Sequence, residues 1–340
     1  MFTRGYSVAI VLFWLATTGW LVKEKILPPL LVGDPPSYRT ILDVNSTANA
    51  PVGWDILLNG KRLGGAISRT ARLDDGINQL YCRVTLRELP LAELTPAWIG
   101  AFMKVLDSKN TNGVADIGVD SEATIDIDPL NRPINFLSTT RIGPPEGDAG
   151  RRSLLAGMDL TVVMRGKMVG DAMHILMHSG EIEYHTQIAI PPDALIGDIL
   201  SPQTRLPGLR VGQHWTVPVY SPFRPPNSPI ELLHAVVERK DPILWHDRIV
   251  PALLVVYRSD PGLSLTSDQS ARAQMWVDYQ GDVIKQEVVL LSSRLTFVRT
   301  DPDEPSTGEM PDTTRPLRAP PVDLENVTAP NHQTESVDSP

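Results

Sequence analysis

The feature that most constrains this chain is a period-two alternation of apolar and polar residues that recurs through residues 54–299. Residues 79–87 show it clearly, because leucine, cysteine, valine and leucine alternate there with polar or amphipathic residues. Such alternation is typical of a β-strand with one buried face. Turn dipeptides such as Asn59-Gly60 separate the runs and favour hairpins. The pattern therefore predicts a mainly β, antiparallel fold.

Two short helices are expected to interrupt the strands. A Thr-Pro pair at residues 95–96 is a helix start, and Trp98, Phe102 and Met103 follow it at helical spacing. Residues 193–200 predict a second, shorter helix. We expect an incompletely closed β-barrel, or two curved sheets, wrapped around one or two short helices.

A short pattern of strand, aspartate, turn and strand occurs twice, with Asp128 and Asp278 at the two corners. The repetition raises two alternatives for residues 51–300. They form either one barrel or two related halves, at about residues 51–145 and 155–300.

Residues 6–22 form an uncharged run that would make a helix about 26 Å long, close to the thickness of a bilayer core. We expect residues 1–27 to be a single transmembrane anchor, with a cytoplasmic N-terminus and an extracytoplasmic (periplasmic) body. A cleaved signal peptide and a buried helix are the alternatives. Residues 28–50 contain several prolines and are predicted to be a spacer.

Charge is concentrated at the other end of the chain. Residues 301–340 hold eight prolines and nine acidic residues against two basic ones, with no aromatic residue, so we expect a disordered tail. The remaining 300 residues are nearly neutral, with 31 acidic and 29 basic residues. Without a basic cluster, the chain is not expected to bind nucleic acid.

Motifs of the common enzyme classes are missing from the sequence: GxSxG, GxxxxGK[ST], GxGxxG and HExxH do not occur. Cys82 is the single cysteine, which excludes an intrachain disulfide and a zinc site built on cysteine pairs. The sequence therefore predicts a non-catalytic protein without a cofactor.

The densest group of side chains with metal-binding or pocket-forming chemistry lies in residues 158–185, which hold five of the nine methionines. His174 and His178 are four residues apart, and His185 follows on the next expected strand. Three imidazoles could bind zinc or copper, which makes them a candidate metal site. The alternative is that the methionines fill a core or line a pocket and the histidines are on the opposite face.

A ligand cavity is the second candidate site. If the expected helix lies inside a half-open barrel, Trp98, Phe102 and Met103 would enclose an acyl-chain cavity together with Met173 and Met177. An ordinary core between helix and sheet is the alternative reading of the same residues.

Three stretches, WDILLNGKRLGGAISRTARLDDG at residues 54–76, RVGQHWTVPVYSP at 210–222 and WVDYQGDVIKQEVVLLSSRLTFVR at 276–299, resemble a family of exported bacterial proteins of unknown function. The β-fold of that family is similar to that of the periplasmic lipoprotein carriers. The resemblance covers about residues 50–300 and implies an incomplete antiparallel barrel around a helix, with a hydrophobic interior.

These observations lead to three hypotheses on function. The first is a membrane-anchored extracytoplasmic β-domain that binds a lipophilic ligand, or a lipidated or other envelope partner, without catalysis. The second is a scaffold or interaction subunit of an envelope complex. The third is a metal-binding protein or enzyme that uses the three histidines.

Overall fold

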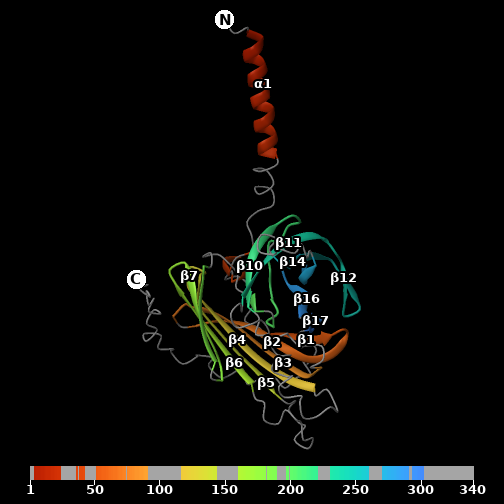
Figure 1. Ribbon diagram of the computed structural model, residues 1–340. Coiled ribbons are helices and arrows are strands. Elements are labelled where there is room, and N and C mark those ends of the chain that lie inside the picture. The colour runs from red at the N-terminus through yellow and green to blue at the C-terminus, as the bar shows by residue number, and fades with distance from the viewer. Residues whose placement is uncertain are drawn as a thin grey trace, which may run out of the picture. The chain divides into compact units, whose positions relative to one another are not determined.

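The protein is seen in a computed structural model that describes residues 4–23, 36, 38–42, 51–73, 75–90, 116–143, 160–180, 182–189, 197–198, 200–220, 230–259, 270–290 and 293–301. The helices are α1 (Arg4–Leu21) and α3 (Tyr38–Ile41) (Figure 1). The strands are β1 (Val52–Leu58), β2 (Lys61–Arg72), β3 (Asn78–Pro90), β4 (Asp116–Ile127), β5 (Pro133–Gly143), β6 (Leu160–Val169), β7 (Ala172–Ser179), β8 (Ile182–Ala189), β9 (Gly197–Asp198), β10 (His214–Tyr220), β11 (Ile230–Lys240), β12 (Ile243–Trp245), β13 (Arg248–Val250), β14 (Ala252–Ser259), β15 (Ala271–Asp278), β16 (Val283–Leu290) and β17 (Ser293–Arg299).

Fifteen strands form one sheet in the order β8-β7-β6-β5-β4-β3-β2-β1-β17-β16-β15-β14-β11-β10-β9. All neighbouring strands are antiparallel except β9 and β10, which are parallel. Strands β1–β8 form a first series, and β9–β11 with β14–β17 form a second. Strand β1 joins the two series by pairing with β17. Strands β12 and β13 form a separate hairpin. Among the described strands, β8 and β9 end the sheet without pairing to each other, so the sheet is open. The prediction of a mainly β, antiparallel and incompletely closed fold is confirmed.

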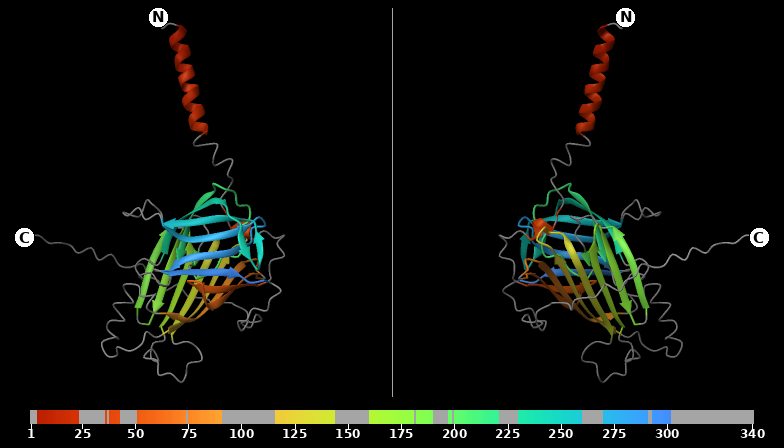
Figure 2. Two further views of the ribbon diagram at one scale, coloured as in Figure 1. Left: turned by 90° about the vertical axis from the view of Figure 1, so that its right-hand side faces the viewer. Right: turned by 90° about the vertical axis from the view of Figure 1, so that its left-hand side faces the viewer.

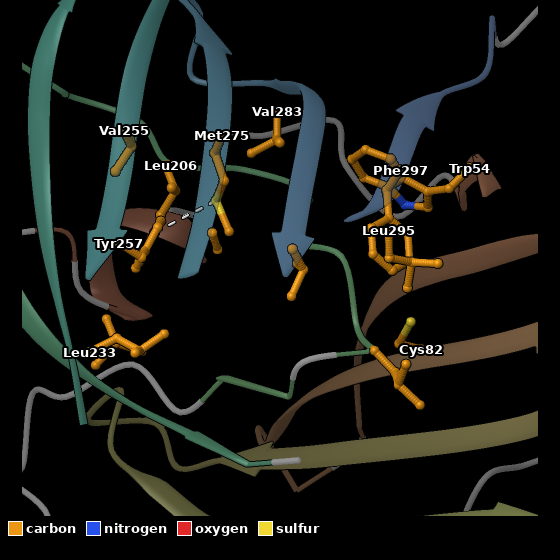
Figure 3. Packing of buried hydrophobic residues seen from close by; sticks show 14 of the residues in the cluster. Trp54, Cys82, Leu206, Leu233, Val255, Tyr257, Met275, Val283, Leu295 and Phe297 are labelled. Atoms are coloured by element: carbon orange, nitrogen blue, oxygen red, sulfur yellow. Dashed lines mark hydrogen bonds between the residues drawn. The ribbon is translucent and has the colours of Figure 1, made fainter. Parts of the chain in front are cut away.

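The sheet curls around a single large core. Cys82 on β3 and Leu233 on β11 are separated by six strands in the sheet order, yet they belong to one cluster of buried apolar side chains with Trp54 and Tyr257 (Figure 3). Figure 2 shows the two series of strands from opposite sides. The face that carries these side chains is therefore concave, and we call it the inner face.

Residues 200–213 connect β9 to β10 along the chain and lie against the inner face. We call them the crossing segment. Leu206 N donates a hydrogen bond to Gly281 O (2.7 Å), and Val283 N donates one to Thr204 O (3.1 Å). Leu206 is buried in the same cluster as the β14 and β15 side chains (Figure 3). The segment thus packs against the inner face through both backbone hydrogen bonds and apolar burial.

Ion pairs with Asp282 also hold the crossing segment in place. Asp282 Oδ1 lies 3.1 Å from Arg205 Nε and 3.4 Å from a terminal nitrogen of Arg299. Gly281 permits the close approach, because a Cβ at that position would lie 2.5 Å from Cα of Pro207. The backbone of the segment therefore cannot move away without breaking several contacts at once.

The prediction of a helix over residues 193–200 is wrong for the residues of this stretch that the structure describes, 197, 198 and 200. Gly197 and Asp198 form β9, which pairs in parallel with Val219 and Tyr220 of β10. Pairing with the end of the sheet satisfies backbone groups that a two-turn helix would leave partly open. The other expected helix, at residues 95–106, lies outside the described residues.

The one short helix of the described body is α3. Its Tyr38 and Ile41 are buried in the main core, within the stretch that the sequence predicted as spacer. The N-terminal helix α1 covers nearly the predicted range, and large apolar side chains from Ile10 to Leu21 are exposed on it. None of the helices in the described part of the chain meets the length and hydropathy needed to cross a bilayer.

Candidate functional site

The methionines of the predicted cluster line the inner face at β6 and β7. Met164 is paired with Met177 and Met168 with Met173 across these strands. Met164, Met173 and Met177 are buried, while His174 and His178 point to the opposite face and are exposed. The period-two reading of Met173 and Met177 as inward side chains is confirmed, whereas Trp98, Phe102 and Met103 lie outside the described residues.

A glycine shapes this methionine cluster. Gly166 on β6 is opposite Ile175, and a Cβ at Gly166 would lie 2.8 Å from Sδ of Met173 and 3.4 Å from Cβ of Phe136. Phe136, Met164, Met173 and Ile175 form their own buried cluster at this end of the sheet. The inner face thus has two apolar regions, this one and the main core.

Three buried polar atoms on the inner face lack a hydrogen-bond partner among the described residues. They are the indole nitrogens Nε1 of Trp54 and Trp215 and the hydroxyl oxygen of Ser138. Two other hydroxyl groups on the same face as Ser138 do have partners, because the hydroxyl oxygens of Ser121 and Thr140 are 2.9 Å apart. A buried donor without a partner costs about 1–3 kcal/mol, so each of the three requires an explanation.

Tyr257 on β14 is a deeply buried titratable group of the inner face. Its ring meets Trp215 edge to face at a centroid distance of 6.2 Å, and its hydroxyl donates to Met275 Sδ at 3.6 Å. Burial raises the pKa of Tyr257 far above its usual value, so the phenol stays neutral. Elsewhere on the inner face, the Ser68 hydroxyl on β2 lies 3.5 Å from the sulfur of Cys82 on β3.

The three predicted metal ligands lie on one exposed face. His185 on β8 is paired with Leu176, which places it on the same side as His174 and His178. Nε2 of His185 lies 2.6 Å from a carboxylate oxygen of Glu183. Within the described ranges, no three histidine, cysteine, aspartate or glutamate side chains are close enough to hold a metal ion. The structure brings these histidines to one surface without forming a metal centre from them.

The outer face of β3 and β4 carries ion pairs and amide contacts. Arg83 binds Asp120 through two hydrogen bonds of 3.1 Å, and this hydrogen-bonded contact raises the pKa of the Arg83 guanidinium. Burial, followed by the charge of Glu122, raises the pKa of Tyr81 to about 12, and the Arg69 guanidinium lies 5.2 Å from the Tyr81 ring centroid. These groups stabilise the sheet and have no arrangement for acid–base catalysis.

The β12–β13 hairpin was not predicted from the sequence. In residues 243–250 two short, mostly apolar runs flank a His-Asp turn, but the sequence alone does not show which face is covered. Leu244 and Ile249, which lie opposite each other, are the side chains left exposed.

Comparisons with known proteins show similarity at the level of structure. Scans against protein-family models and against curated proteins find no match. Among solved structures, the chain is similar to a β-barrel-like protein of the domain of unknown function DUF1849 from Brucella abortus. The identity is 8%, the coverage is 74% of this chain and 95% of that chain, and the TM-score is 0.41.

Proposed function

We propose that the chain is a membrane-anchored, extracytoplasmic (periplasmic) β-domain that binds a lipophilic ligand, or the lipid moiety of an envelope partner, at its inner face without catalysis. The observation that carries the proposal is the pair of buried indole N–H groups of Trp54 and Trp215, which have no acceptor among the described residues. An apolar ligand with a carbonyl or ester oxygen would supply that acceptor in an otherwise apolar face. The open sheet edge between β8 and β9 supports access for such a ligand.

The anchor part of the proposal depends on α1. Its exposed apolar residues include Leu12, Phe13 and Trp14, a continuous apolar surface that is costly in water. Insertion in a bilayer would cover all sides of the helix at once. We place the body on the extracytoplasmic side because Arg4 precedes the apolar run, whereas Lys23, Glu24 and Lys25 after it carry a net charge of only +1.

Native mass spectrometry of the full chain, released from a mild detergent, tests the ligand. We expect an adduct of lipid mass on the wild-type protein. Trp54→Phe and Trp215→Phe each remove one N–H donor and should lower its occupancy about fivefold, the equivalent of a hydrogen bond worth about 1 kcal/mol. Trp245→Phe is the matched control, because its Nε1 donates to Arg299 O at 2.8 Å outside the inner face.

One combination of results would contradict the ligand proposal. If the wild-type protein carries no lipid and the Trp54→Phe variant is more stable than wild type, the indole groups are unpaired donors in a dry core. The ligand proposal would then be wrong, and a scaffold subunit of an envelope complex would be the better description.

A further inference from the structure

Outside α1, the two most exposed large apolar side chains of the described residues are Leu244 (72%) and Ile249 (76%). They are direct cross-strand partners on the β12–β13 hairpin. Exposed apolar residues are common when single, but a paired, protruding set marks a contact surface.

The back of the hairpin is fixed to the body. Ile243 packs against the cluster that Trp276 forms on the outer face of β14 and β15, and Trp245 Nε1 donates to Arg299 O at 2.8 Å. At the turn, His246 and Asp247 both have positive φ angles, 45° and 59°, as in a tight hairpin turn. The front face with Leu244 and Ile249 is therefore held outward and cannot fold down onto the sheet.

We propose that this hairpin touches the surface of the bilayer that holds the anchor, inserting Leu244 and Ile249 among the lipid headgroups. The inference rests on the proposed anchor: residues 24–35 can span at most about 40 Å, so the body stays close to the bilayer. Arg248 is exposed next to Ile249 in the chain and Lys240 is exposed at the end of β11, neither with an ion-pair partner in the described part of the chain; Asp247 in the turn is exposed as well. Cations at this position suit anionic headgroups.

The size of the apolar pair argues against a protein partner or a second copy. A stable protein interface buries at least about 1,000 Å², far more than two side chains can supply. A tethered domain needs much less, because the anchor already provides a high effective concentration at the membrane. Two apolar side chains next to the exposed Arg248 are sufficient for a bilayer contact of this kind.

The test uses the full chain in vesicles of phosphatidylcholine with one-fifth phosphatidylglycerol, and part of the lipid carries a nitroxide quencher on its acyl chain. An environment-sensitive fluorophore is attached at Leu244→Cys. Leu130→Cys is the matched control, because Leu130 is 71% exposed on the β4–β5 turn, and Leu12→Cys reports on the anchor. Cys82 is buried, so the wild-type chain should remain unlabelled.

We expect quenching at residue 244 to exceed that at residue 130 at least threefold, and Ile249→Asp to remove most of the difference. Equal quenching at 244 and 130, with strong quenching at residue 12, would overturn the hairpin contact and leave the anchor standing. Quenching at 244 without quenching at 12 would support the hairpin and contradict the anchor. If neither 12 nor 244 is quenched, both proposals are wrong. Pyrene excimers between chains labelled at 244, persisting at low protein-to-lipid ratio, would identify a second copy as the partner and overturn the bilayer contact.

Discussion

Asp128 and Asp278 hold two hairpin turns with the same set of hydrogen bonds. Oδ1 of each accepts from the backbone N–H two residues later at 2.9 Å and from the one four residues later at 2.8 Å. In both turns the third residue after the aspartate, Asn131 or Gly281, has a positive φ. The repeated sequence pattern thus corresponds to a repeated local structure at the ends of β4 and β15.

Replacing either aspartate by alanine should lower the free energy of unfolding by about 1–2 kcal/mol, because two backbone donors lose their acceptor. Asparagine keeps an acceptor oxygen, so Asp278→Asn should cost less than half as much as Asp278→Ala. Denaturant titrations of the chain in mild detergent, followed by tryptophan fluorescence, measure both. An equal loss for alanine and asparagine would show that the carboxylate charge matters more than the acceptor geometry.

Gly281→Ala should be more harmful than Gly180→Ala, although both glycines have positive φ. At Gly180 an added Cβ meets nothing within 4 Å, so only the backbone cost of about 1 kcal/mol applies. At Gly281 the Cβ would press on Pro207 of the crossing segment, for a total cost of about 2–4 kcal/mol. Thermal unfolding gives the stabilities, and limited proteolysis within residues 200–213 should be faster only in the Gly281 variant. Similar stabilities for the two variants would mean that the crossing segment adapts.

Alkaline conditions should weaken the fold through Tyr81. Because its pKa is about 12 in the folded protein and 10 as its ordinary value, folding favours the protonated phenol. This contribution is complete below pH 10 and decreases as pH rises from 10 to 12, where the unfolded chain releases the proton first. Tyr81→Phe should therefore flatten the stability profile in that window, and Tyr279→Phe, at an exposed position, should not. Unfolding titrations at pH 9 to 12 measure the effect, and parallel profiles for wild type and Tyr81→Phe would contradict it.

Metal analysis decides between the two readings of the histidine cluster. We expect the purified chain to hold no stoichiometric zinc or copper, because His185 is paired with Glu183 and the three imidazoles lie on an exposed face. Elemental mass spectrometry after dialysis gives the metal content. One metal ion per wild-type chain, lost in His174→Ala, would establish the metal site that the sequence suggested.

Part of the candidate site could be predicted from residue order. Period-two alternation placed Met173 and Met177 inside and His174 and His178 outside, because neighbouring side chains of a strand alternate between faces. The unpaired indole of Trp54 could not be predicted, since the presence of an acceptor depends on residues distant in sequence. The exposure of Leu244 could not be predicted either, because the order of residues does not show which face of a hairpin the body covers.

The sequence by itself determined the strands, their inward and outward faces and the tight turns, since these depend on local sterics and on a two-residue period. Only the tertiary structure decided how the sheet curls, which brings Cys82 and Leu233 into one core. It also decided that residues 197–198 become a strand and that the crossing segment fills the curl. These features depend on which distant surfaces meet, and burial of apolar area between them outweighs the weak helical preference of a short segment.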